Sequence, residues 1–286
     1  MINSPMFFMG LFITVTSIVL YSIVHRLPFN PFLGFRIGYS YLSRDLWVKL
    51  NKVAALVFMS VGLVTTVLSV IIADEVIVLE VFLGLIIVSL VVLINYSSKA
   101  AELELMKIPE HREVGKVEVL TPFYPSIAHI VITLVPYVLG ITFIALNAHS
   151  LPDSVAIHFT SSGAPDRFMP KTQALILMTF TPTFVIGLTL FFYYLGVKKP
   201  EIYYRPWLRG KLRIFVTFIY TFLSLTSPLA SIAMVDTVWF NIYGEHLTLL
   251  THLMMALIIV IIAQIIYFIA YITKHYLKYK SRTRII

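Results

Sequence analysis

The sequence predicts an all-α membrane protein: a helical bundle of about seven transmembrane helices, with an interfacial amphipathic helix and one small, partly β loop outside the membrane. Three observations support this class. Of the 286 residues, 59% are hydrophobic and only 13% are charged, which is about half the charged share of a soluble domain. The mean hydropathy is +0.89. Apolar stretches of about twenty residues, enough for a helix to cross the hydrocarbon core, recur along the chain.

Seven of these stretches are long enough to span a bilayer. The first is not expected to be a cleaved signal peptide, because residues 1–5 carry no positive charge and no small-residue cleavage site follows. Cysteine is absent, which excludes disulfide-stapled folds and thiolate metal sites. The expected spans are 6–24, 53–73, 76–95, 126–148, 172–196, 214–235 and 247–273.

The charged residues indicate how the spans are oriented. Alternating the spans places 20 of the 22 Lys and Arg residues and seven of the 14 acidic residues on one side, which gives +13 there and −5 on the other. By the positive-inside rule the basic side is cytoplasmic. We therefore expect an N-out, C-in protein of the plasma membrane. The basic segments are 25–52, 96–121, 197–213 and 274–286.

The spans and their connections predict four parts. The tail interleaves Tyr with Lys and Arg, which is typical of an anchor at a membrane surface. No phosphate- or base-reading motif accompanies the basic segments, so nucleic acid is not an expected partner. The parts are a three-span unit over 1–95, a cytoplasmic linker over 96–125, a four-span unit over 126–273 and a basic cytoplasmic tail over 274–286.

Polar residues inside the spans are few. No span carries a charged residue near its middle, which argues against a pump or a proton-coupled transporter. His129, His252 and Gln264 are expected to form hydrogen bonds between helices.

The connection over residues 30–52 combines a turn-rich entry with an amphipathic stretch. Leu42, Leu46 and Leu50 recur at helical spacing, with Trp47 beside them, and Ser43 is a suitable N-cap. This pattern predicts a helix lying at the membrane interface with its Trp at headgroup depth. The alternative is a plain anchoring helix that leads into the second span.

The connection between the fourth and fifth spans, over residues 149–171, predicts a small structured cap on the outer side. Apolar residues at 155, 157 and 159 alternate with smaller or polar ones, which is typical of a half-buried strand. Residues 161–163 and the Pro165-Asp166 pair have turn chemistry, and Pro170 suits the first turn of the next helix.

This loop also holds most of the polar side chains on its side. His158 with Asp153 and Asp166 could bind a metal or titrate near neutral pH, but such residues more often hydrogen-bond a tight loop to itself. Arg167 and Lys171 are the only basic residues on the outer side. We expect neither a metal nor another cofactor.

A longer ordered pattern runs through the loop: a Leu-Pro pair, an apolar residue, His-Phe, Gly, Pro-Asp, an aromatic residue and Lys. It comprises Leu151, Pro152, Ile157, His158, Phe159, Gly163, Pro165, Asp166, Phe168 and Lys171. The pattern resembles the conserved loop of the SdpI-type membrane proteins, a family named for a bacterial immunity protein.

The connection over 30–52 resembles the second hallmark of the same family. Its matching residues are Asn30, Gly34, Arg36, Tyr39, Ser40, Trp47 and Asn51, while Ile37-Gly38 replaces the family's usual Thr-Pro. In family members the outer-loop unit comes first. Here the two units stand in permuted order, with one extra span.

The resemblance implies a non-catalytic sensor or immunity-like protein that recognises an extracellular ligand, such as an antimicrobial peptide, and couples to a cytoplasmic protein partner. For ligand binding we select the polar residues of the outer loop, and for coupling the inner motif. The ligand-binding candidates are His158, Asp166, Arg167, Lys171 and Asp153. The coupling candidates are Asn30, Gly34, Arg36, Trp47 and Asn51.

Two other functional classes, an enzyme and a transporter, make different demands on the sequence. An enzyme is not expected, because the sequence has no HExxH or GxSG motif and no nucleotide-binding loop. A transporter, or an accessory subunit of a larger membrane complex, is the alternative reading, because proline-containing, polar-lined helices can enclose a cavity.

Overall fold

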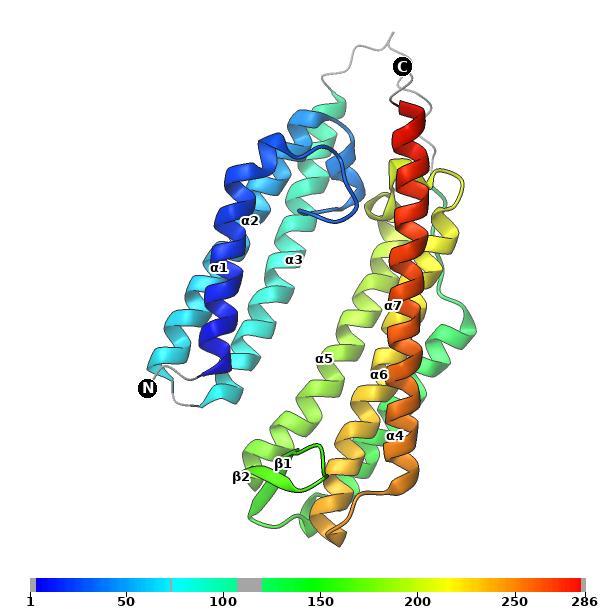
Figure 1. The fold of residues 1–286 in the computed structure, drawn as a ribbon. Coiled ribbons are helices and arrows are strands. Elements are labelled where there is room, and N and C mark those ends of the chain that lie inside the picture. The colour runs from blue at the N-terminus through cyan, green and yellow to red at the C-terminus, as the bar shows by residue number, and fades with distance from the viewer. Residues whose placement is uncertain (1–3, 73, 107–119, 284–286) are drawn as a thin grey trace. The chain divides into compact units, whose positions relative to one another are not determined.

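The computed structural model describes residues 4–72, 74–106 and 120–283. Within them, seven helices are long and apolar enough to cross a membrane, and a two-stranded hairpin joins the fourth and fifth. The polytopic helical class is thereby confirmed, and the protein is a multi-pass membrane protein. The helices are α1 Pro5–Ile23, α2 Arg44–Ile71, α3 Glu75–Leu105, α4 Ile127–Asn147, α5 Lys171–Lys198, α6 Leu212–Tyr243 and α7 Thr248–Thr283, and the strands are β1 Ser154–Phe159 and β2 Pro165–Pro170 (Figure 1).

The chain forms two compact units, which are described separately. The first contains residues 1–121, 200–209 and 273–286, and the second contains 122–199 and 210–272. Each unit therefore combines segments that are distant in the sequence. The four-part division expected from the sequence stays a prediction.

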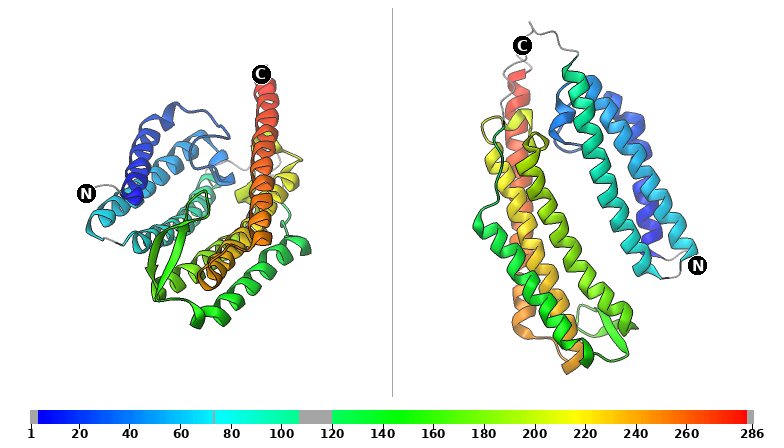
Figure 2. Two further views of the ribbon diagram at one scale, coloured as in Figure 1. Left: turned by 60° about the horizontal axis from the view of Figure 1, so that its bottom comes forward. Right: turned by 180° about the vertical axis from the view of Figure 1, so that it is seen from behind.

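In the first unit, α1, α2 and α3 lie side by side (Figures 1 and 2). Glycines allow α1 and α2 to pack closely: a Cβ added to Gly10 would lie 2.5 Å from Thr66 Oγ1, and one added to Gly62 would lie 2.5 Å from Thr14 Oγ1. Small residues permit such backbone approach between membrane helices. The core of this three-helix packing contains Met6, Val61, Val78 and Phe82.

The amphipathic stretch before the second span is not a separate interfacial helix. It forms the first turns of α2, so the simpler alternative, a helix leading into the span, is correct. Ser43 is the N-cap as predicted, and its Oγ accepts the Leu46 N–H at 3.1 Å. Trp47 is fully buried in protein rather than exposed to lipid, because this end of α2 is covered by α3 and by folded loops; its depth in the membrane stays a prediction.

Besides α2, which begins nine residues early, three helices extend well beyond their predicted spans. α3 continues into the predicted linker, α6 runs eight residues past its expected end, to Tyr243, and α7 continues through the predicted tail to Thr283. A helix can continue into the headgroup region with polar side chains, so the apolar stretch marks only the part inside hydrocarbon.

In the second unit, hydroxyl groups link α4, α5 and α6. Tyr193 Oη lies 2.5 Å from Ser224 Oγ and 3.2 Å from Thr133 Oγ1. As expected, His129 and Gln264 also form interhelical hydrogen bonds, to Thr221 Oγ1 and to the carbonyl of Phe218. The expectation for His252 was wrong, because its Nδ1 contacts the Thr248 carbonyl in its own helix.

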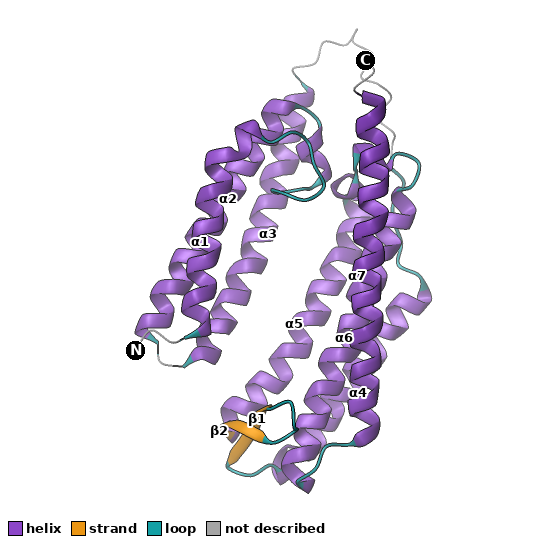
Figure 3. Cartoon of the chain, in the orientation of Figure 1, coloured by secondary structure: helices purple, strands orange, loops and turns teal. Residues whose placement is uncertain are grey.

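The hairpin is the only strand pair among the described residues (Figure 3). Its register is irregular around Ile157, which breaks the expected alternation: both Val155 and Ala156 are buried. An extra residue of this kind turns the following side chain to the other face. Pro165 and Asp166 begin β2 instead of forming the turn, and Pro170 ends β2 just before α5.

Candidate functional site

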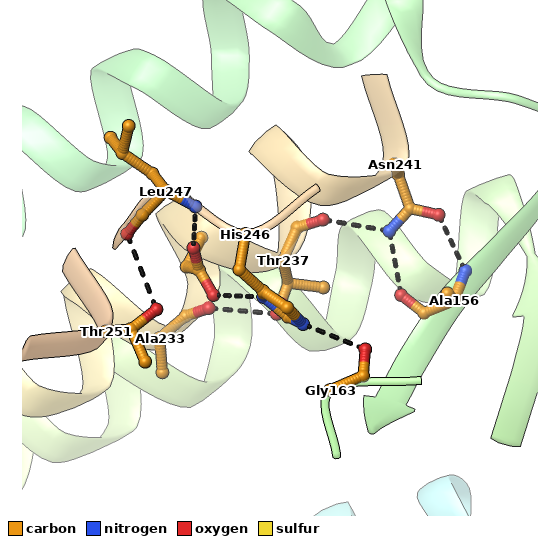
Figure 4. Close-up of polar contacts among 9 residues, drawn as sticks. Ala156, Gly163, Ala233, Thr237, Asn241, His246, Leu247 and Thr251 are labelled. Atoms are coloured by element: carbon orange, nitrogen blue, oxygen red, sulfur yellow. Dashed lines mark hydrogen bonds and ion pairs between the residues drawn. The ribbon is translucent and has the colours of Figure 1, made fainter. Parts of the chain in front are cut away.

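The hairpin is anchored to α6 by the side-chain amide of Asn241. Asn241 Oδ1 accepts the Ala156 N–H at 2.7 Å, and its Nδ2 donates to the Ala156 carbonyl at 2.8 Å (Figure 4). One side chain therefore satisfies both backbone groups of a buried strand residue. Buried backbone groups require such partners, so this contact fixes the position of β1.

A second anchor holds the hairpin turn. Asp236, which is 4% exposed on α6, accepts the Leu247 N–H at 3.0 Å with one oxygen, and its other oxygen lies 2.7 Å from His246 Nδ1. His246 Nε2 lies 3.2 Å from the carbonyl oxygen of Gly163 (Figure 4). The His246 ring therefore bridges the Asp236 carboxylate and the Gly163 carbonyl, which ties the hairpin turn to α6.

Aromatic rings fill the space beside this polar anchor. The Phe159 ring lies 4.7 Å from that of Phe240 and 4.6 Å from that of His246, centroid to centroid. These are edge-to-face arrangements of the kind that stabilise aromatic pairs. The hairpin is therefore held to the end of α6 by both polar and apolar contacts.

Lys171 takes part in the architecture of the loop. Its Nζ donates to the carbonyls of His149 and Leu151, at 3.1 and 2.9 Å, and its backbone N–H donates to the Asp153 carbonyl. The Asp153 residue is exposed. Of the predicted ligand-binding residues, Lys171 is thus already engaged in closing the loop.

The other predicted residues lie together on the exposed part of the hairpin. His158 Nδ1 is 2.5 Å from Asp166 Oδ1, and the two side chains are 61% and 44% exposed. Arg167 pairs with His158 in the strand register, and the neighbouring Phe168 is 54% exposed. We name these four residues the hairpin patch. Among the described residues, no group of three or more His, Asp or Glu side chains could hold a metal ion.

The predicted inner motif forms a compact loop in the first unit. Asn30 Oδ1 accepts the backbone N–H groups of Phe32 and Leu33, at 2.9 and 2.6 Å, which closes a turn. Arg36 donates to the carbonyls of Pro31 and Gly34. Both side chains therefore shape the loop to which they belong.

Asn51 locks this loop onto α2. It is fully buried, its Oδ1 accepts the Phe35 N–H at 2.5 Å, and its Nδ2 donates to the Trp47 carbonyl at 2.9 Å. Gly34 has φ +92°, and a Cβ there would lie 2.1 Å from Asn51 Oδ1. Glycine is thus required both for the backbone conformation and for the close approach of the amide.

An aromatic cluster, which the sequence reasoning did not single out, lies behind the loop. Its ring centroids are 5.2–5.8 Å apart, and the Arg205 guanidinium lies 5.6 Å from the Tyr41 centroid. Burial raises the pKa of Tyr41 to about 12, and burial lowers the pKa of Arg205 to about 10. The cluster contains Phe29, Tyr41, Trp47, Trp207 and Tyr276.

Other residues missed from the sequence are Asp236, Asn241 and His246. Asp236 and Asn241 lie near the C-terminal end of α6, and His246 follows that helix within three residues. The presence of Asp236 and Asn241 at the end of an apolar helix could have indicated a polar contact there. The sequence alone does not show that the partners of this contact lie on the hairpin.

Comparison with known families matches two segments. Residues 26–97 match the SdpI/YfhL protein family, and residues 136–181, which include the hairpin, match a domain of unknown function, DUF1648. No curated protein and no solved structure matches the chain. The permuted order of the two motifs stays a prediction. The resemblance itself is confirmed: residues 26–97, which contain the inner loop, α2 and most of α3, are similar to the SdpI/YfhL family.

Proposed function

We propose that the protein is a non-catalytic sensor or immunity-like protein of the plasma membrane, and that its hairpin patch recognises an extracellular ligand, such as an antimicrobial peptide. The observation that carries this proposal is the exposed His158–Asp166 pair, next to Arg167 and Phe168, on an anchored hairpin. Exposed ionic and aromatic groups on a rigid support are suited to recognition.

The patch offers complementary chemistry to a peptide. A guanidinium can hold a carboxylate by two hydrogen bonds, the imidazole–carboxylate pair can exchange partners with backbone or side-chain groups, and an exposed ring can cover an apolar side chain. Lys171 and Asp153 support the loop in this proposal, with Lys171 as a positioning residue.

The inner loop is proposed to couple to a cytoplasmic partner. Asn30, Gly34, Arg36 and Asn51 hold one another in place, which supports a positioning role, as does the burial of Trp47. The loop presents Phe32 and Leu33, which are 49% and 52% exposed, as the side chains available to a partner.

A growth assay tests recognition at the hairpin. A sensitive bacterial host that expresses the full chain is exposed to a panel of purified membrane-active antimicrobial peptides, and the inhibitory concentration is compared with that of a host carrying the double variant His158→Ala and Asp166→Ala. We expect protection against at least one peptide by the parent chain and its loss in the variant at equal protein level. Ser161→Ala, an exposed change in the same hairpin, is the matched control.

The alternative, a transporter or an accessory subunit, makes a different prediction. Substrate- or proton-driven uptake into vesicles containing only the purified chain would favour transport, and stable co-purification with one membrane partner would favour an accessory role. Equal protection by the parent and the double variant would reduce the hairpin to a structural cap.

A further inference from the structure

The groove between α6 and α7 has features of a binding site that the proposed function does not use. In an apolar stretch of 18 residues of α7, only 6% of the residues are buried inside the protein, whereas 17% to 33% are buried in the corresponding stretches of the other six helices. The contacts to α6 include ring pairs such as Phe215–Phe268, at 5.5 Å, and Phe218–Tyr267, at 5.2 Å. Because large rings separate the two backbones, space remains on both sides of Phe218.

Two cavities occupy this space and share Phe218 and Gln264. The larger has a volume of about 520 Å³, and the smaller, which apart from Gln264 is lined by apolar residues, has a volume of about 290 Å³. The larger cavity is lined by Arg213, Ile214, Thr217, Phe218, Thr221, Leu225, Val260 and Gln264.

The polar groups of the larger cavity are arranged along its length. Arg213, Thr217 and Thr221 follow one another at i, i+4 and i+8, so they form a stripe on one face of α6. Arg213 is exposed in the first turn of that helix, and it belongs to the basic segment 197–213, which the charge pattern predicts to lie on the cytoplasmic side. None of the described residues that line the cavity is acidic, so its mouth is complementary to an anion.

Gln264 provides a separate indication of a ligand. Its amide nitrogen, Nε2, donates to the Phe218 carbonyl at 3.0 Å. Its amide oxygen, Oε1, is buried and has no hydrogen-bond partner among the described residues. Exchanging the two amide atoms would place Oε1 against the carbonyl oxygen, so the orientation is fixed. A buried acceptor without a donor is costly in an apolar environment.

We propose that this groove binds one anionic, lipid-like amphiphile, with its phosphate or carboxylate head at Arg213, a hydroxyl or amide donor at Gln264 Oε1, and its apolar chain along α6 and α7. The apolar wall matches a hydrocarbon chain, and the guanidinium matches an oxyanion. The proposal does not depend on the role of the hairpin.

Native mass spectrometry of the delipidated full chain in mild detergent tests the proposal. The chain is titrated with phosphatidylglycerol, with phosphatidylcholine of the same acyl chains, and with inorganic phosphate. We expect one phosphatidylglycerol to bind at least about tenfold more tightly than phosphatidylcholine, because the quaternary ammonium of phosphatidylcholine offsets the charge of the same phosphate group. Competition by inorganic phosphate at equal concentration would instead identify a site for the free anion and would overturn the amphiphile.

Three variants locate the site. Arg213→Gln is expected to remove the preference for phosphatidylglycerol, and Val260→Phe, which adds bulk to the groove wall, is expected to weaken both lipids. Lys211→Gln changes an exposed cation two residues away that does not line the groove, and should leave the preference intact. Equal losses in Arg213→Gln and Lys211→Gln, or unchanged binding of both lipids in Val260→Phe, would overturn the proposal. Size-exclusion profiles confirm that each variant is folded.

Discussion

The hairpin and the inner loop are both irregular connections between helices, yet they use their polar residues in opposite ways. The hairpin is held from outside itself, by Asn241 and His246, and leaves His158 and Asp166 exposed. In the inner loop, Asn30 and Arg36 hydrogen-bond the backbone of the loop itself, and Asn51 of α2 adds one bond from outside it. A connection that is anchored by another element can leave its polar side chains exposed. In a connection that stabilises itself, the polar side chains are occupied by hydrogen bonds to its own backbone.

The largest expected effect comes from the self-stabilised loop. Gly34→Ala should lower the free energy of unfolding by more than about 3 kcal/mol, because it combines a left-handed backbone with a clash against the buried amide of Asn51. Thermal unfolding followed by fluorescence-detected size exclusion measures this. Gly210→Ala, also at positive φ but with nothing within 4 Å of the added Cβ, should cost only about 1–2 kcal/mol. Equal losses would show that the close approach to Asn51 is unimportant.

The next largest effect tests the external anchor of the hairpin. Asp236→Asn should cost about 2 kcal/mol, because a buried charge-assisted hydrogen bond to His246 is weakened, and it should speed amide hydrogen exchange in the hairpin turn. Glu245→Gln changes an exposed acid in the same connection and should change stability by less than about 0.5 kcal/mol. If exchange in the turn does not respond to Asp236→Asn, the histidine bridge does not hold the hairpin.

A smaller effect should depend on pH. The pKa of Tyr41 is raised to about 12 by burial, so the folded protein keeps this proton while the unfolded chain loses it at the ordinary value of 10.0. The contribution of the protonated Tyr41 to the free energy of unfolding is fully present below pH 10 and is lost as the pH rises to 12. The free energy of unfolding then falls by at most about 1.4 kcal/mol per pH unit.

Tyr41→Phe removes this contribution, so its stability relative to the parent should improve between pH 10 and pH 12, as measured by chemical unfolding at each pH. Tyr243→Phe, at a residue that is 58% exposed, is the control. Parallel curves for the parent and Tyr41→Phe would contradict the burial argument.

The smallest stability effect is expected on the hairpin patch. Replacing His158 by Gln and Asp166 by Asn should change the free energy of unfolding by less than about 1 kcal/mol, because exposed ion pairs contribute little. The same double variant should lose ligand recognition if the proposed function is right. A stability loss as large as that of Asp236→Asn would show that the pair serves the fold.

The sequence predicted the helices well because a span requires about twenty apolar residues, and the N-cap at Ser43 because its side chain acts locally. It missed Asn241, because a hydrogen bond between residues 85 positions apart leaves no local pattern. It did not reveal that Trp47 is buried inside the protein, because amphipathic spacing does not say whether protein or lipid covers a face. The orientation in the membrane and the roles of the candidate residues stay predictions.

The bond between Asn241 and Ala156 has one further consequence. Ala156 directs both its N–H and its carbonyl toward α6, so a helix side chain occupies the place that a third strand would take. An incoming peptide therefore cannot extend the sheet at this point of β1 by strand addition. At this point of β1, a ligand would have to be selected by side-chain chemistry, and two copies of the protein cannot pair strand to strand there.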